Sequence, residues 1–314
     1  MLFRSWQKAA REKLGELLGL PLQSCEDCFT VTETLETDTY REIRFEFQSE
    51  PGYFIPTHLL IPKNAKMPLP GVICLQGHST GKHFSLGYKR YETDDENSIA
   101  SRAFAVQSVR EGMCALVIDQ RYMGDAGHQE NGKPACLKNH PALSTMMWGR
   151  TAIGERVWDV SRLIDVAEAH LTEYIDTKKL ICLGNSGGGT ATFYAACMDE
   201  RISLAVPSCA VCTYEDSIMA MHHCACNYIP SIRKYFEMGD LGCLIAPRKY
   251  VQVNGKDDKG FPIGGAIACF DIIQSAYDQI GKSDLCRHVI GGAGHQFYPE
   301  ESWPIIHELM NMED

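Results

Sequence analysis

The chain has 314 residues, and 40 acidic against 30 basic side chains give it a formal net charge of −10. No basic stripe of the kind that binds phosphate backbones is present, so we do not expect nucleic acid as a partner. Residues 1–20 are charged and amphipathic rather than continuously apolar, so we expect neither a signal peptide nor a membrane span there.

The first predicted elements are a helix and two strands. A helix over residues 2–19 carries an apolar face. That face consists of Trp6, Ala10, Leu14, Leu17 and Leu18. We therefore expect residues 1–40 to form a helical N-terminal lead that packs on the body of the protein. Apolar residues alternate with polar ones over residues 43–47, which is typical of a half-exposed strand, and residues 53–62 supply another.

Strand-like runs then alternate with helical stretches. The runs cover residues 71–76, 113–119, 178–184, 202–208, 248–254 and 285–290. A helical stripe precedes the third of them and consists of Val157, Val160, Ile164, Ala167 and Leu171. Repeated strand–helix units after an antiparallel start predict an α/β fold with a mostly parallel central sheet flanked by helices. No repeat or linker divides the chain, so we expect residues 1–314 to form one domain.

The most informative motif is G-N-S-G-G at residues 184–188, between an apolar run at 180–183 and a helix-forming stretch at 189–196. A G-x-S-x-G turn in this setting is the nucleophile elbow of α/β-hydrolases. The turn strains the serine backbone, and the glycines let strand and helix pack closely. Ser186 is therefore the candidate nucleophile, at a helix N-terminus that favours a developing oxyanion. The alternative is a glycine-rich turn that merely contains a serine.

A serine nucleophile needs a base and an orienting acid, in the chain order Ser, Asp/Glu, His. The strand-like run 249–255 is followed at once by Asp257 and Asp258, either of which could approach the base. The last predicted strand runs into a glycine-rich loop that carries His295. This histidine is the candidate base.

Two other histidines lie nearby in the sequence. His288 falls within the last predicted strand and His307 on the C-terminal helix. Packing or solvent roles are expected for both.

The tetrahedral oxyanion of acyl transfer needs two amide donors. One is expected from Gly187, the residue after the nucleophile, and the other from the loop after an earlier central strand. The apolar run 70–75 ends in Q-G-H-S-T-G at residues 76–81, which makes the amide of His78 the second donor. This run resembles the HGxxG-type oxyanion loop with glutamine in place of the first histidine. A plain glycine-rich turn is the alternative.

Further stretches resemble one family. The run 255–262 is similar to the G-x-x-D-x-x-x-P pattern of acetyl xylan esterase-like and dienelactone hydrolase-like enzymes, in which that aspartate is the triad acid. The resemblance favours Asp258 as the acid, with Asp257 as the fallback. Residues 117–124 resemble the D-x-R-G-x-G strand end of acetyl xylan esterases, with Tyr122 where glycine is usual. Residues 154–160 and 244–248 resemble a predicted-hydrolase branch related to those esterases.

The resemblance covers roughly residues 40–300. It implies a single α/β-hydrolase domain that acts on ester bonds, often acetyl esters, without a metal or organic cofactor. The triad that it implies is Ser186, Asp258 and His295. In the esterases a glutamine usually follows the nucleophile, whereas this chain has Gly187.

Fourteen cysteines are fewer than a disulfide scaffold of this length requires. Cys74, Cys114 and Cys182 fall in strand-like apolar runs, where a thiol packs as a small hydrophobic group. We therefore expect reduced thiols and a cytoplasmic location.

One cluster of soft ligands combines Cys209-x-x-Cys212 with H-H-C-A-C at residues 222–226, and Cys25-x-x-Cys28 supplies a distant pair. Because the spacing is not that of a common structural zinc site, we expect no metal. Residues 212–243 are instead expected to form an excursion over the active site. Pocket candidates, with core packing as the alternative, are Trp148, Tyr214, His222 and Tyr228.

These observations predict a serine hydrolase that cleaves carboxylic esters through an acyl-enzyme. The preference for short acyl groups is implied by the family resemblance alone. The alternatives are a thioesterase, lactonase or peptidase with the same triad, and a ligand-binding protein without catalysis. The expected partner is a small-molecule ester, and homo-oligomerisation is open.

Overall fold

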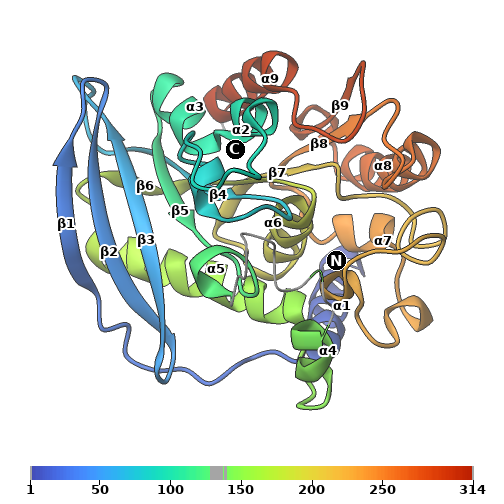
Figure 1. Cartoon of the computed structure of the whole chain (residues 1–314). Helices are drawn as coiled ribbons and strands as arrows, with labels where there is room; N and C mark the ends of the chain where they lie inside the picture. The colour runs from blue at the N-terminus through green and yellow to red at the C-terminus, as the bar shows by residue number, and fades with distance from the viewer. Residues whose placement is uncertain (1, 128–136, 138–139, 313–314) are drawn as a thin grey trace.

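The computed structural model describes residues 2–127, 137 and 140–312. These residues form a nine-stranded sheet in the order β1-β2-β3-β5-β4-β6-β7-β8-β9 (Figure 1). Its antiparallel part consists of β1 (Thr30–Glu36), β2 (Tyr40–Glu50) and β3 (Tyr53–Pro62), and β3 also pairs antiparallel with β5 (Cys114–Ile118). The predicted antiparallel start is confirmed.

From β5 onward, neighbouring strands of the sheet are parallel. The remaining strands are β4 (Leu69–Leu75), β6 (Ile175–Asn185), β7 (Ile202–Ser208), β8 (Lys249–Gly255) and β9 (Cys286–Gly291). Because parallel strands point the same way, the loops that follow them meet at one edge of the sheet. Every candidate catalytic residue follows one of these strands.

Helices cover both faces of the sheet (Figure 1). On one face lie α3 (Phe104–Arg110) and α9 (Pro299–Asn311), and on the other lie α1 (Leu2–Leu18), α5 (Ala152–His170) and α6 (Gly187–Met198). The other helices are α2 (Glu96–Arg102), α4 (His140–Met146), α7 (Met238–Gly242) and α8 (Ile263–Gln279). In the described ranges, no helix combines the length and apolar character needed to cross a bilayer.

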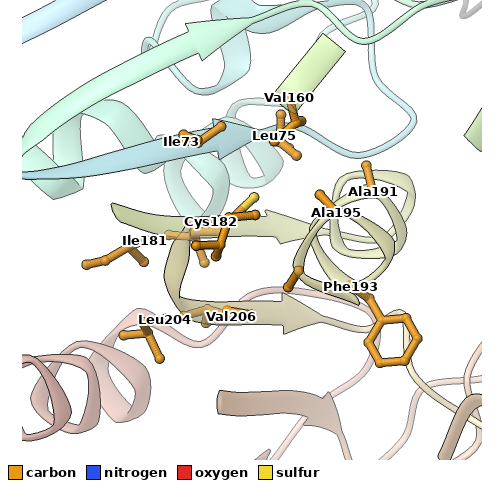
Figure 2. Close-up of a cluster of buried hydrophobic side chains, with 14 of the residues drawn as sticks. Ile73, Leu75, Val160, Ile181, Cys182, Ala191, Phe193, Ala195, Leu204 and Val206 are labelled. Atoms are coloured by element: carbon orange, nitrogen blue, oxygen red, sulfur yellow. The ribbon is translucent and has the colours of Figure 1, made fainter. Parts of the chain in front are cut away.

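Part of the core lies where α5 and α6 pack on the parallel strands (Figure 2), and the same cluster continues under α3 and α9 on the other face of the sheet. Strands covered on both faces read as continuous apolar runs, as in the fully buried Val72–Leu75 of β4. The predicted stripe of α5 is confirmed, since all five of its side chains are at most 2% exposed. Burying one Val, Leu or Ile side chain contributes about 1.5–3 kcal/mol, so this contact fixes α5 against the sheet.

The N-terminal lead differs from its prediction. Only residues 2–18 are helical, and residues 30–36 form β1, an edge strand whose side chains are almost all exposed. Its threonines and valine favour extended backbone. Because none of the strand faces the core, the sequence has no apolar alternation that would indicate it.

The buried face of α1 also differs from the predicted one. Trp6 is 38% exposed, whereas Gln7 is 2% exposed. The Gln7 side-chain amide donates to the carbonyls of Cys243 (2.9 Å) and Ala246 (2.7 Å). A polar side chain thus occupies a core position because two backbone acceptors satisfy it.

A buried ion-pair network connects the loop after β5 to α5 and β2. The Arg121 guanidinium donates two hydrogen bonds to the Asp159 carboxylate, both at 2.8 Å, and a third to Glu50 at 2.7 Å. Ser49 also donates to Asp159 at 2.6 Å, and Arg156 donates to the Arg121 carbonyl. Arg121 lies in the run 117–124 and Asp159 in the run 154–160, so the hydrogen bonds between these two side chains join the two runs.

The network generates a stability prediction. Asp159→Asn should lower the free energy of unfolding by about 3 kcal/mol, because the buried Arg121 loses its bidentate anionic partner. Urea denaturation followed by circular dichroism measures the change. Glu168→Gln is the control. The Glu168 side chain pairs with Arg201 but is 43% exposed, so loss of this ion pair should lower the free energy of unfolding by less than about 1 kcal/mol. Equal losses in the two variants would contradict this account.

Candidate active site

Ser186 lies at the junction of β6 and α6, as the elbow motif predicts. It is the N-cap residue of α6, with φ 57° and ψ −124°, a backbone conformation that non-glycine residues rarely adopt. The Ser186 amide donates to the Ser208 carbonyl at 2.8 Å, and the Ser186 carbonyl accepts from the Thr190 amide at 2.8 Å. Two backbone hydrogen bonds and the start of a helix therefore hold the strained residue.

The loop after β4 lies directly against this elbow. A Cβ atom added at Gly188 would lie 1.9 Å from the Leu75 carbonyl oxygen, so only glycine fits there. A Cβ added at Gly77 would lie 3.1 Å from the Cβ of Ser186. Close backbone approach is thus the physical requirement behind both glycines.

His78 and Gly187, the two predicted oxyanion donors, are neighbours. A Cβ added at Gly187 would lie 2.7 Å from Cε1 of His78. The loop that carries His78 is held by Gln76, whose side-chain amide donates to Asp119 at 3.0 Å. Asp119 also accepts hydrogen bonds from the backbone and side-chain nitrogens of Lys82. The glutamine that replaces histidine in the HGxxG-like run therefore orders the loop through Asp119.

The structure distinguishes the two adjacent aspartates. Asp258 is 5% exposed, and its Oδ2 lies 2.7 Å from Nδ1 of His295. Its Oδ1 accepts from the amides of Gly260 (2.8 Å) and Phe261 (3.2 Å). Asp257 is exposed. Asp258, the aspartate that the resemblance favours, is thus hydrogen-bonded to His295, the candidate base.

The environment of Asp258 keeps it ionised. Burial by itself raises the pKa of this carboxyl group, but the hydrogen bond and charge of His295 and the amides of Gly260 and Phe261 outweigh burial. The pKa of Asp258 consequently lies below its ordinary value. The carboxylate can therefore orient an imidazole and stabilise its cationic form at neutral pH.

The His295 ring is oriented from a second side. It stacks on Phe261, with ring centroids 5.9 Å apart and an interplanar angle of 16°. The His295 side chain is 33% exposed, so one side of it remains accessible. Phe261 was not identified from the sequence, although it lies only three residues after Asp258.

Cys209, after β7, connects the elbow to the Asp258–His295 pair. Its preceding residue, Ser208, accepts the Ser186 amide, and the Cys209 thiol donates to the Gln296 carbonyl at 3.3 Å. The Cys209 sulfur and ligand atoms of Asp258 and His295 lie within 4.8 Å of one another. Burial, reinforced by the Asp258 charge, raises the pKa of Cys209 to about 12, so it stays a protonated thiol.

The other two histidines have structural partners. His288 Nε2 lies 3.0 Å from the side-chain oxygen of Asn254, and burial lowers the pKa of His288 to about 4. His307 pairs with Glu111 at 2.8 Å. Both lie outside the Asp258–His295 arrangement, as expected.

The paired cysteines of the sequence do not assemble into one ligand set. The Cys212 thiol donates to the Pro262 carbonyl at 3.4 Å, apart from the contacts of Cys209, while Cys25 contacts the Gln48 carbonyl in the antiparallel part of the sheet. A different group comes together instead. Ligand atoms of His78, Cys224 and Cys226 lie within 4.8 Å of one another.

Residues 212–243 pack against the loops that carry the candidate site. The Ser217 hydroxyl donates to the Gly260 carbonyl at 2.6 Å, and the rings of His223 and Phe261 lie 5.3 Å apart. The Thr190 hydroxyl, in the first turn of α6, donates to the Asn227 side-chain oxygen at 3.2 Å.

The predicted pocket residues occupy different environments. Tyr214 is 2% exposed and its hydroxyl hydrogen-bonds to that of Tyr194, which agrees with the core-packing alternative. Tyr228 is 40% exposed and, with Tyr214, lines a cavity of 460 Å³. His222 is exposed, and Trp148 is 85% exposed.

Comparison with known proteins agrees with this fold. The model of the Abhydrolase family matches residues 2–288. The chain belongs to this family. Over 251 residues it is 24% identical to YtaP of Bacillus subtilis (strain 168), provisionally described as a hydrolase, covering 79% of this chain and 78% of YtaP.

Solved structures show the same fold. A Bacteroides fragilis protein provisionally described as an acetyl xylan esterase superposes with a TM-score of 0.78 at 19% identity, covering 96% of this Abhydrolase chain and 77% of that one. A glucuronoyl esterase from Solibacter usitatus superposes with a TM-score of 0.71 at 14% identity, and the superposition covers 98% of this chain and 92% of the esterase. The predicted α/β-hydrolase fold is confirmed.

The ionised Asp258 generates a pH prediction. At pH 7, Asp258→Asn should be less stable than the wild type by about 2 kcal/mol, because a charge-assisted hydrogen bond is lost. A carboxylate with a lowered pKa stabilises the fold above its unfolded pKa of about 3.9, and this contribution disappears as the pH falls through the folded pKa. The difference in unfolding free energy should therefore shrink below about pH 4.

Urea unfolding at a series of pH values measures this difference. Asp257→Asn is the matched control, since it changes the adjacent exposed carboxylate, and its stability should follow that of the wild type. A constant deficit for Asp258→Asn at every pH would contradict the assigned ionisation.

Proposed function

We propose that this protein is a serine hydrolase that cleaves carboxylic esters, with Ser186 as nucleophile, His295 as base and Asp258 as orienting acid. The observation that carries the proposal is the buried, ionised Asp258 on Nδ1 of His295, at the sheet edge where Ser186 begins α6 in a strained conformation. A buried Asp–His pair beside a G-x-S-x-G elbow is the arrangement that serine-dependent acyl transfer requires, and the same arrangement serves thioesters, lactones and peptides.

The reaction is a two-step acyl transfer. Asp258 holds the proton on Nδ1 of His295, so Nε2 is the nitrogen that accepts the Ser186 proton as the hydroxyl attacks the ester carbonyl. The amides of His78 and Gly187 receive the oxyanion, and each is worth about 2.7–4 kcal/mol of barrier stabilisation. His295 then protonates the departing alcohol and activates a water molecule that releases the acid.

The proposed substrates are esters of carbohydrates with short acyl or methyl groups. Support comes from the descriptions of the structural relatives, which include an acetyl xylan esterase, a glucuronoyl esterase and a methylesterase. Residues 212–243 form one wall of the site, because they contact the loops after β4 and β8 and the first turn of α6. Of the pocket candidates, Tyr228 is the nearest in sequence to these contacts, because it follows Asn227 directly, and it is 40% exposed.

Ser186→Ala tests the nucleophile. The variant should lose turnover of p-nitrophenyl acetate and covalent labelling by a fluorophosphonate, because alanine offers no oxygen to attack. Its unfolding transition should remain close to that of the wild type. Ser203→Ala is the control: its hydroxyl donates to the Leu180 carbonyl within the sheet, and labelling should persist.

Full activity of Ser186→Ala would refute the assignment.

A panel of p-nitrophenyl esters, acyl-CoA thioesters, lactones and aminoacyl amides, assayed with the wild-type protein, identifies the substrate class. Short-chain oxygen esters are expected to react fastest.

A further inference from the structure

We propose that His78, Cys224 and Cys226 form a binding site for a soft divalent transition metal, with Zn²⁺ as the ion that fits best. One imidazole and two thiolates are a donor set that zinc prefers. The site joins the loop after β4 to the segment 212–243, beside the candidate nucleophile. It shares His78 with the proposed ester hydrolysis, which uses the backbone amide of this residue, whereas the metal would use its ring; no step of that reaction passes through the metal.

The distances fit a tetrahedral ion. His78 Nε2 lies 3.1 Å from the sulfur of Cys226, and all three ligand atoms lie within 4.8 Å of one another. With bonds of about 2.0 Å to nitrogen and about 2.3 Å to sulfur, donors around Zn²⁺ stand about 3.5–3.8 Å apart. Movements of no more than about 1 Å therefore convert the present arrangement into a coordination shell. Three protein ligands leave one position for water or a small ligand.

Burial and outer contacts favour this group. Cys224 is 6% and Cys226 1% exposed, so an ion bound there is shielded from bulk water. The Asn227 side-chain amide donates toward the Cys226 sulfur at 3.9 Å and to the Cys224 carbonyl at 3.3 Å, while its oxygen accepts from Thr190. Hydrogen bonds of this kind orient metal ligands and stabilise thiolates.

The first turn of α6 adds an electrostatic contribution. The Thr190 side chain donates to that of Asn227, the residue that follows Cys226. Asn227 therefore lies at the N-terminal, positive end of the α6 dipole. A helix N-terminus favours negative charge nearby, and the thiolate, which is the form of cysteine that binds metal, is negatively charged. The His78 ring packs against Gly187, the first residue of that helix.

The second group of possible ligands, Cys209, Asp258 and His295, is a weaker metal site. Its thiol has a pKa raised to about 12 by burial and donates to the Gln296 carbonyl. Its carboxylate and imidazole already pair with each other. Metal binding there would have to break these interactions. In the His78 group, shifts of no more than about 1 Å bring the three ligand atoms to the spacing of a coordination shell.

Metal titration of the full chain tests the proposal. Protein treated with a reductant and a chelator is titrated with Zn²⁺ in competition with a chromophoric zinc indicator, and one tight equivalent is expected. Cys224→Ser and Cys226→Ser should each weaken binding at least about 100-fold, because each removes a ligand. Zn²⁺ should also raise the melting temperature of the wild type but not that of these variants.

Cys212→Ser is the matched control. The hydroxyl of the substituted side chain can still donate to the Pro262 carbonyl, as the Cys212 thiol does. The Zn²⁺ affinity of this variant should therefore equal that of the wild type. Co²⁺ supplies a signature of ligand type: a sulfur-to-cobalt charge-transfer band in the near ultraviolet should appear in the wild type and fall to about half in each single cysteine variant, in proportion to the remaining thiolates.

Three results would overturn the proposal. They are the absence of the charge-transfer band, undiminished Zn²⁺ affinity in Cys226→Ser, and loss of binding in His295→Gln but not in the cysteine variants. Far-ultraviolet circular dichroism verifies that each variant is folded, and His78→Gln, which retains both thiols, should also weaken binding.

Discussion

The strained backbone of Ser186 is the constraint on which the rest of this site depends. A residue with φ 57° and ψ −124° persists only if its surroundings fix it. Here β7 accepts its amide and α6 begins from its carbonyl. The same turn needs glycine at residues 77 and 188, because the loop after β4 approaches within van der Waals contact. One backbone conformation thus determines where the candidate nucleophile, the candidate oxyanion loop and the helix N-terminus lie.

The parallel half of the sheet gathers the remaining groups. Strands β6, β8 and β9 end at the same edge, which brings residues 186, 258 and 295 to one side of the molecule although they are far apart in the chain. Below that edge, Arg121 and Asp159 lock β5 to α5, and Asp119 orders the loop that carries His78. Rigid support of this kind is what a catalytic arrangement requires.

The sequence predicted the elements whose burial leaves a periodic pattern. The strands from β2 to β9 and the α5 stripe were identified because apolar residues must face the core. β1 was missed, since an exposed edge strand carries no such signal. Gln7 was missed because two carbonyls that satisfy its amide lie more than 230 residues away in the chain.

Within the candidate site, motif order predicted Ser186, His295 and the pair of aspartates, but the turn alone did not separate Asp257 from Asp258. The separation depends on the amides of Gly260 and Phe261, which draw one carboxylate inward. The group of His78, Cys224 and Cys226 was beyond prediction from spacing, because 148 residues separate His78 from Cys226. Tyr214, in turn, could not be assigned to core or pocket before its contact with Tyr194 was known.

Acid quenching of the protein during turnover of p-nitrophenyl acetate, followed by proteolysis and mass spectrometry, tests the central claim most directly. The account predicts one trapped acetyl group, on the peptide that contains Ser186 and localised to that residue by fragmentation. An acetyl group found instead on Cys209, Cys226 or a histidine, with Ser186 unmodified while alcohol is released, would contradict it.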